Sequence, residues 1–459
     1  MIKRIFISII SLLLLLNVNS SFAINPVNQL AKVTVESILD SISEPIIPDK
    51  TFLIIKFGGV GNSKTDNKNA FQKAIKAIKK NGGGKLIVPK GIYLINGPIH
   101  LISHMDLHLE EGALLRFGSN PEDYLPVVKT SWEGTFIYNY SPFIYAYNCT
   151  NVSITGKGVI NGGASQTWLQ WVEKENTDRQ LSRDMNHSRL PIEQRIFGKG
   201  HYLRPQLIQF YDCKNIKVEG VKMEDSPFWC LHLLKCENVI VRGVSYDAQN
   251  LNNDGIDPEY SRNVLIEDVK FNNHDDNIAI KAGRDDDGRA SDVLTENIVI
   301  RNCSFQGKPA IAIGSEMSAG VQNIFIQDCT HTGKLMRGIY LKSNPDRGGF
   351  IRNVYVKNVD FGEVLDCLYI SSFYHNEGKG HVSDISNIYF ENVRCKKATG
   401  TGIVIQGFKD KFIRDIYFKN ITINWAKNGI SMENTENIVM SNVLIGDLAT
   451  EPIRPKSKN

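Results

Sequence analysis

The stretch Asn353-Val-Tyr-Val-Lys-Asn-Val359 is one copy of a pattern that returns along most of the chain. Each copy has an Asn, or once an Asp, followed by apolar residues one and three positions later and, after the first copy, six positions later. The copies begin at Asn151, Asn215, Asn238, Asn263, Asn297, Asn323, Asn353, Asn387, Asp415 and Asn437. A short alternating strand of this kind cannot bury its apolar face alone, so the copies must stack on one another.

A second column of apolar residues lies inside the same units, at Ile256, Ile278, Ile311, Ile339, Leu368, Ile403 and Ile430. Two strand columns per unit, with no helical period between them, predict coils built from several parallel sheets. The sequence therefore predicts an all-β fold, a single-domain right-handed parallel β-helix. A leucine-rich horseshoe would need a Leu-rich repeat, whereas Val, Ile and Asn dominate here. Asn suits the turns because it tolerates the left-handed conformation and can form hydrogen-bonded ladders.

The two ends of the coil region are assigned from local patterns. Residues 1–23 combine Lys3 and Arg4 with an apolar run too short to span a bilayer and small residues near Ala23, as in a secretory signal peptide. Residues 24–459 are expected to form the β-helix domain, with residues 50–117 as an N-terminal cap and first coils. Within them, residues 67–80 keep helical spacing and a run of glycines follows. We expect an exported protein, periplasmic or secreted, without a membrane span.

Composition and charge exclude several classes of protein. The 459 residues are 42% apolar and 22% charged, which excludes a disordered chain. Fifty-three Lys and Arg stand against 49 Asp and Glu, a balance that argues against a nucleic-acid binder. Five of the eight cysteines occupy repeated interior positions and are expected to be buried thiols. No spacing indicates zinc, so no metal site and no cofactor are predicted, and a capped solenoid is expected to be a monomer.

Three acids are expected to gather at one edge of the coils. Asp254 and Asp276 each lie two positions before a second-column residue in consecutive units. Their backbones should therefore be one strand spacing apart, about 4.8 Å. Asp275 adds a third carboxyl, and like charges this close raise at least one pKa. A solvated turn or a bound cation is the alternative, but three acids at one edge favour catalysis.

The chain resembles the polygalacturonases of glycoside hydrolase family 28 over most of residues 24–459. The resemblance is carried by Phe57 to Asp66, Arg204 to Asn215, Asp225-Ser-Pro-Phe-Trp229, Asn252-Asn-Asp254-Gly-Ile-Asp257, Asp275-Asp276, Ile313-Gly-Ser-Glu-Met-Ser318 and Asp346-Arg-Gly-Gly349. It implies that Asp254 and Asp276 activate water while Asp275 protonates the leaving oxygen. The reaction it implies is inverting hydrolysis, with acid and base about 6.5 to 9.5 Å apart.

Two positions depart from the family pattern. By alignment with the family motifs, Lys308 stands where the family has a His, and Tyr340 stands where it has an Arg, whereas the family Lys is kept as Lys342. The resemblance implies that the family's Arg and Lys contact substrate carboxylates. The lost Arg suggests a subsite for a sugar without a carboxylate, or one held differently, and argues against plain homogalacturonan. Tyr340 is expected to face outward, where stacking on a sugar and ordinary surface packing remain alternatives.

The substrate-binding residues predicted in this way are Asn252, Lys281, Arg284, Lys308, Tyr340 and Lys342. Arg284 opens an acidic loop, in which a substrate clamp and a solvated loop both remain open; the loop lacks the further spacing of a calcium site. Residues 162–205 form a polar insertion carrying Trp168, Trp171, Arg179, Arg183 and His187. Such residues suit acidic sugars, and an insertion beside the cleft can close one end of it, although packing over a neighbouring coil is the alternative.

The sequence thus predicts an inverting hydrolase of galacturonic-acid-containing linkages in pectin, exo-acting on galacturonan or rhamnogalacturonan oligosaccharides. Its expected partner is a pectic polysaccharide or oligosaccharide. Two alternatives remain. A metal-dependent polyuronate lyase would need a calcium cluster and a basic residue as proton abstractor. A non-catalytic carbohydrate-binding β-helix is suggested by the lost His and Arg.

Overall fold

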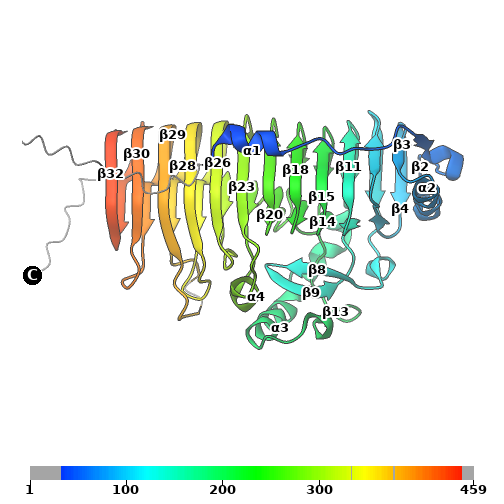
Figure 1. Cartoon of the computed structure of the whole chain (residues 1–459), viewed down its shortest axis with the longest axis horizontal. Coiled ribbons are helices and arrows are strands. Elements are labelled where there is room, and N and C mark those ends of the chain that lie inside the picture. Colours follow the sequence, from blue (N-terminus) through cyan, green and yellow to red (C-terminus); the bar gives the residue numbers. More distant parts are fainter. Residues whose placement is uncertain (1–32, 332, 376–377, 447–459) are drawn as a thin grey trace, which may run out of the picture.

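The computed structural model describes residues 33–331, 333–375 and 378–446, and the predicted signal peptide lies outside them. The described chain is a right-handed parallel β-helix, as predicted, with its coils stacked from the N-terminal cap toward the C-terminal strands (Figure 1). Helices are few and lie outside the coils. None of the helices in these ranges is both long and apolar enough to cross a membrane.

The strands of the coils are, in chain order, β1 (Thr51–Leu53), β2 (Asn62–Asp66), β3 (Gly84–Val88), β4 (Gly91–Ile95), β5 (Ile99–His100), β6 (Met105–Leu109), β7 (Ala113–Phe117), β10 (Ile144–Tyr147), β11 (Thr150–Gly156), β12 (Val159–Asn161), β14 (Ile208–Tyr211), β15 (Lys214–Glu219), β16 (Lys222–Glu224), β17 (Leu231–Leu234), β18 (Glu237–Arg242), β19 (Ser245–Asp247), β20 (Ile256–Glu259), β21 (Arg262–Glu267), β22 (Ile278–Ile280), β23 (Thr295–Arg301), β24 (Ser304–Phe305), β25 (Ile311–Ile313), β26 (Val321–His331), β27 (Lys334–Lys342), β28 (Phe350–Ser371), β29 (Asp384–Gln406), β30 (Ile413–Ile423), β31 (Ala426–Glu433) and β32 (Thr435–Ile445). The elements outside the coils are β8 (Val128–Trp132), β9 (Thr135–Asn139) and β13 (Ile196–Phe197), the helices α1 (Val35–Ser41), α2 (Lys68–Lys80), α3 (Glu175–His187) and α4 (Asp285–Arg289), and short 3-10 turns.

Both predicted columns are in register. In the first, Val264 of β21 pairs in parallel with Val239 of β18 and Ile298 of β23. In the second, Ile278 of β22 lies between Ile256 of β20 and Ile311 of β25. These residues point inward and are fully buried, so each coil buries its apolar face against the coils on either side.

The turn asparagines form the expected ladder. Asn263 has a φ of 54°, in the left-handed region, and its side-chain amide donates to the Asn238 carbonyl oxygen at 3.3 Å. Asn297, one coil on, donates to Asn263 at 3.2 Å. The same residue type therefore provides both the turn conformation and a bond between coils.

The N-terminal end of the solenoid is covered. Helix α2 buries Phe71, Ala74 and Ile78 against the first coil, as the predicted cap requires. Helix α1 lies along the outside of the coils, where Ile38 packs on Leu265 and Val299 (Figure 1). The eight cysteines are all buried, with free thiols.

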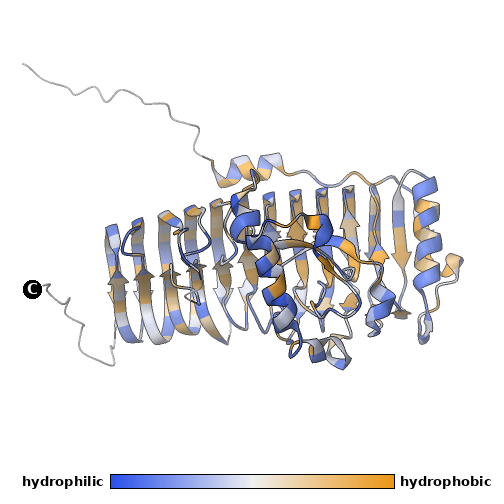
Figure 2. Ribbon diagram, turned by 90° about the horizontal axis from the view of Figure 1, so that it is seen from below, coloured by the Kyte–Doolittle hydropathy of each residue, from blue (hydrophilic) through white to orange (hydrophobic). Residues whose placement is uncertain are grey.

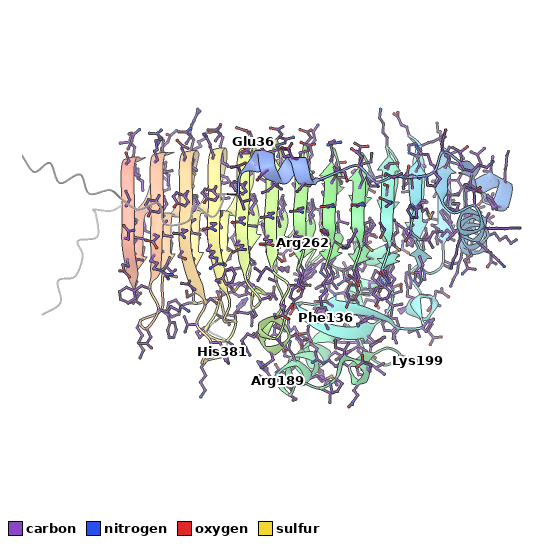
Figure 3. All side chains as sticks on the ribbon, in the orientation of Figure 1. Glu36, Phe136, Arg189, Lys199, Arg262 and His381 are labelled. Atoms are coloured by element: carbon purple, nitrogen blue, oxygen red, sulfur yellow. The ribbon has the colours of Figure 1, made fainter. Side chains whose placement is uncertain are left out.

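A projection beside the coils combines the antiparallel β8–β9 hairpin with the insertion that contains α3. Phe136 of the hairpin and Arg189, just after α3, both lie on this projection (Figure 3). Seen from below, it covers middle coils and leaves the C-terminal coils uncovered (Figure 2). The hairpin precedes the repeat interruption and was not predicted. Trp168 and Trp171 are buried in an aromatic cluster with Tyr140, so packing, not sugar stacking, is their role.

Candidate active site

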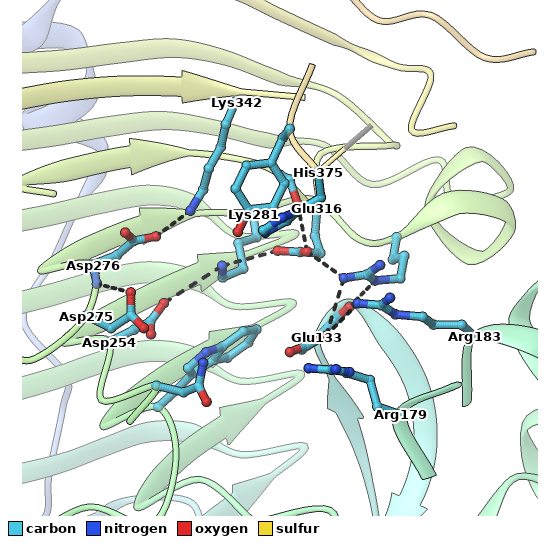
Figure 4. A pocket seen from close by; sticks show the side chains of 15 residues that line it. Glu133, Arg179, Arg183, Asp254, Asp275, Asp276, Lys281, Glu316, Lys342 and His375 are labelled. Atoms are coloured by element: carbon cyan, nitrogen blue, oxygen red, sulfur yellow. Dashed lines mark hydrogen bonds and ion pairs between the residues drawn. The ribbon is translucent and has the colours of Figure 1, made fainter. Parts of the chain in front are cut away.

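A polar cleft of about 500 Å³ lies between the projection and the coils β20 to β27 (Figure 4). Seven of the nine predicted site residues line it, namely Asn252, Asp254, Asp275, Asp276, Lys281, Arg284 and Lys342. Arg179 and Arg183 of α3 line it too, opposite the aspartates in Figure 4. The lining residues that sequence reasoning did not single out are Glu133, Trp229, Ser315, Glu316, Tyr374 and His375.

The three aspartates meet at one edge of the cleft, on neighbouring coils. The N–H of Gly255 donates to the Asp276 carbonyl oxygen at 3.0 Å, which holds Asp254 and Asp276 at equivalent places one strand apart. Burial and the neighbouring carboxylates raise the pKa of Asp254 well above its ordinary value. Burial first, and then Asp276, raise the pKa of Asp275. A raised pKa keeps a proton on Asp275 at pH values where an ordinary aspartate has lost it.

Lys342 is paired with one of these aspartates. Its Nζ lies 2.8 Å from Oδ2 of Asp276, and both side chains are buried. Although burial opposes the charge, the contact with Asp276 raises the pKa of Lys342 well above its ordinary value. Lys342 therefore fixes and compensates the Asp276 carboxylate in the absence of substrate.

Lys281 and Glu316 form the centre of a buried charge network under the cleft. The Lys281 Nζ lies 3.3 Å from Glu316, 3.8 Å from Asp257 and 4.0 Å from Asp254, and 4.5 Å from the centre of the Trp229 ring. Burial raises the pKa of Glu316, but the surrounding cations outweigh it and hold that pKa well below its ordinary range. Glu316 and Trp229 both belong to motifs that carry the family resemblance, and this membership could have marked them as site residues in the sequence.

Arg284 joins the projection to the coils. Its guanidinium donates to the backbone oxygen of Glu133 at 2.8 Å and to Glu316 at 2.8 Å. Arg284 is 3% exposed, so the solvated loop considered from the sequence is not what the structure contains. Asn252 is positioned in a similar way, because its Oδ1 accepts from the buried Arg204 at 2.7 Å.

Lys308 and Tyr340 do not line the cleft. The Lys308 Nζ lies 3.7 Å from Oδ2 of Asp275, on the next coil. Tyr340 is buried beneath Arg337, whose guanidinium lies 4.4 Å from the centre of the Tyr340 ring. Of the two alternatives for Tyr340, the structure shows packing.

One group of side chains within the described residues has the geometry to hold a metal ion. Ligand atoms of His187, Asp285 and Asp346 lie within 4.8 Å of one another, outside the cleft. The carboxylates already have cationic partners, because Asp285 contacts Arg347 at 2.6 Å and Asp346 lies 3.8 Å from Arg289. The three cleft aspartates are not part of this group.

Clustered carboxyl groups in a polar cleft are the groups that a glycosidase uses to cleave a sugar linkage. Residues 128–442 match the sequence model described as glycosyl hydrolases family 28, and the chain belongs to that family. This confirms the resemblance seen in the sequence motifs.

Three relatives place the chain within the family. A solved exopolygalacturonase from Thermotoga maritima is 37% identical, with a TM-score of 0.82, over 89% of this chain and 95% of that one. A probable polygalacturonase from Vitis vinifera is 29% identical over 85% of this chain and 73% of its own length. An endo-polygalacturonase from Pectobacterium carotovorum subsp. carotovorum is 26% identical over 83% of this chain and 89% of its own length.

Proposed function

We propose that this protein is an inverting, exo-acting hydrolase of galacturonic-acid-containing pectic chains, exported through residues 1–23. The observation that carries the proposal is the trio Asp254, Asp275 and Asp276 on neighbouring coils, in a cleft that the projection bounds on one side. The cleft cations suit a substrate made of acidic sugars.

The roles proposed for the three aspartates are those that the family resemblance implies. Asp275, whose pKa is raised by burial and by Asp276, protonates the glycosidic oxygen as the bond breaks. Asp276, held by Lys342, takes the proton of a water molecule that Asp254, near Lys281, helps to orient. An inverting enzyme places that water between acid and base, on the opposite face of the sugar.

Exo action is proposed because the projection closes one side of the cleft. Arg183 of α3 lies 3.3 Å from Glu133 of the β8–β9 turn, and Glu133 also binds Arg284. These contacts tie helix, hairpin and coil together on one side of the cleft, whereas the C-terminal coils are uncovered (Figure 2). The 37% identity to an exopolygalacturonase supports the same mode. Arg179 and Arg183 would bind the carboxylate of the terminal sugar.

A time-resolved digest of homogalacturonan, rhamnogalacturonan and their oligomers tests this proposal. We expect a monosaccharide or disaccharide from the earliest time points, a slow fall in viscosity, and an inverted anomer in the first product by NMR. Long oligomers appearing early would contradict exo action, and a retained anomer would contradict inversion. Loss of activity with a chelator, or unsaturated products, would favour the lyase alternative instead. No cleavage of any of these substrates would favour a non-catalytic carbohydrate-binding β-helix.

Lys308→Met is expected to move the alkaline limb of the pH profile of kcat to higher pH. Burial and Asp276 raise the pKa of Asp275, while the Lys308 ammonium lowers it. Removing that ammonium lets the pKa rise further, so the protonated acid persists to higher pH. The check is kcat against pH for both proteins, with Lys357→Met, an exposed lysine paired with Glu391, as the control. An unchanged limb, or one that moves down, would show that Lys308 does not act on the acid.

A further inference from the structure

The outward row of the second strand column changes in side-chain size from one coil to the next. Ala279 of β22 is in register with Ala312 of β25, and both of these small side chains are buried. The next two residues in the same row are Tyr340 of β27 and Tyr369 of β28. The row therefore passes from two alanines, the first of them on the coil of Asp276, to two aromatic rings on the C-terminal side.

Arg337 lies on top of these rings. Its guanidinium centre is 4.4 Å from the centre of the Tyr340 ring and 4.3 Å from that of Tyr369. Arg337 stands two positions before Ile339, as Asp276 stands two before Ile278, and β22, β25 and β27 are successive neighbours. Arg337 thus shares the row of Asp276 at a distance of two strand spacings, about 10 Å.

The hydrogen-bonding groups of Arg337 are mostly unused within the described part of the chain. Its ion pair is with Asp366, from Nε to Oδ2 at 3.5 Å, and Nε makes no hydrogen bond. Its Nη1 contacts the sulfur of Met336, a weak acceptor, at 3.8 Å. Burial raises the pKa of Asp366, and the Thr401 N–H and Arg337 oppose that rise. Arg284, by contrast, is held by close contacts to carboxylate and carbonyl oxygens.

We propose that Arg337 binds the carboxylate of a uronic acid sugar on the C-terminal side of the catalytic aspartates, and so determines specificity there. The inference rests on the proposed function. A guanidinium stacked on two rings is oriented in advance, and its planar fork matches a carboxylate. The side chain is 18% exposed, so part of it is accessible to a ligand.

This assignment changes the meaning of Tyr340. The loss of an arginine at that position suggested a sugar without a carboxylate, or one held differently. The stacking of Arg337 on Tyr340 supports the second option, because the ring carries a guanidinium from the neighbouring row. The substrate class is then a chain with a uronic acid on both sides of the cleaved bond.

Arg337→Gln tests the proposal in hydrolysis of oligogalacturonides with free carboxylates and of their methyl esters. We expect KM for the free acids to rise about 10-fold or more, since a charge-assisted bond is lost, with little change for the esters. Arg337→Lys keeps the charge but not the planar guanidinium, so its KM for the free acids should lie between those of wild type and Arg337→Gln. Arg394→Gln, an exposed arginine 3.5 Å from Asp360, is the matched control and should match wild type. Tyr340→Arg placed in the Arg337→Gln background should recover part of the loss.

The outcomes separate this inference from the proposed function. Equal losses on acids and esters, or unchanged KM for the acids, would overturn the role of Arg337. If the wild-type protein cleaves none of these substrates, the proposed function fails, and calorimetric titration of the free-acid oligomers into wild type and Arg337→Gln decides on Arg337 alone. Weaker binding by the variant supports the carboxylate site, and equal binding refutes it. Thermal melts of each variant identify any loss of folding.

Discussion

The hydrolytic rate of the Asp275→Asn variant is expected to be about 10²- to 10⁴-fold lower than that of wild type, while the variant keeps its fold. The amide has the shape of the acid but cannot donate the proton that the leaving oxygen needs. The buried, raised-pKa carboxyl that the structure shows is what a general acid requires, and it lies in a cleft with two further carboxyls. Replacing a carboxyl that can ionise by a neutral amide should also not destabilise this acidic cluster.

The measurement is kcat on the substrate identified by the digest, together with a thermal melt. Asp360→Asn is the matched control, because Asp360 is more than half exposed, lies on a C-terminal coil and pairs with Arg394. Its kcat should equal that of wild type. More than a tenth of the wild-type rate in Asp275→Asn would show that another group donates the proton.

The architecture of the coils was predictable because it repeats. Each strand column needs an inward apolar residue at the same place, so Ile256, Ile278 and Ile311 could be aligned by counting, and the structure pairs them in that order. Asp254 and Asp276 could be placed by the same count. A repeat determines which residues share a row, and for these two aspartates that was enough to predict that they are neighbours.

The rest of the cleft depends on contacts that no period describes. The β8–β9 turn reaches Arg284 from about 150 positions earlier in the chain, and only the folded path of the hairpin brings Glu133 there. Trp168 and Trp171 looked like sugar-binding residues by type, but the apolar area of their rings is buried among other aromatics. The stacking of Arg337 over Tyr340 likewise depends on side-chain direction between two rows, which register alone does not give.

Arg204→Met is expected to lower the free energy of unfolding by about 3 to 5 kcal/mol at neutral pH. Arg204 is fully buried and holds both carboxylate oxygens of Glu175, at 2.8 and 3.1 Å, as well as Asn252 at 2.7 Å. It also donates to the backbone oxygens of Pro227 and Leu251, each at 2.9 Å. Methionine fills much of the volume but leaves the buried Glu175 carboxylate without the cation that it is hydrogen-bonded to. The same change frees the start of α3, and with it the wall of the cleft.

The pH dependence of this loss identifies its cause. Burial raises the pKa of Glu175 and Arg204 opposes that rise, so in the variant the pKa rises further. A carboxyl whose pKa is raised by folding does not destabilise the folded state while it is protonated, but it destabilises that state increasingly as pH rises. The loss of unfolding free energy in Arg204→Met should therefore be smaller at pH 4 than at pH 7. The free energy of unfolding is measured in urea at both pH values for wild type, for Arg204→Met and for the double variant Arg204→Met with Glu175→Gln. The double variant should recover stability at pH 7. An equal loss of unfolding free energy at both pH values would mean that lost packing and lost backbone hydrogen bonds cause it. A loss below about 1 kcal/mol would show that Arg204 does not hold the start of α3 in place.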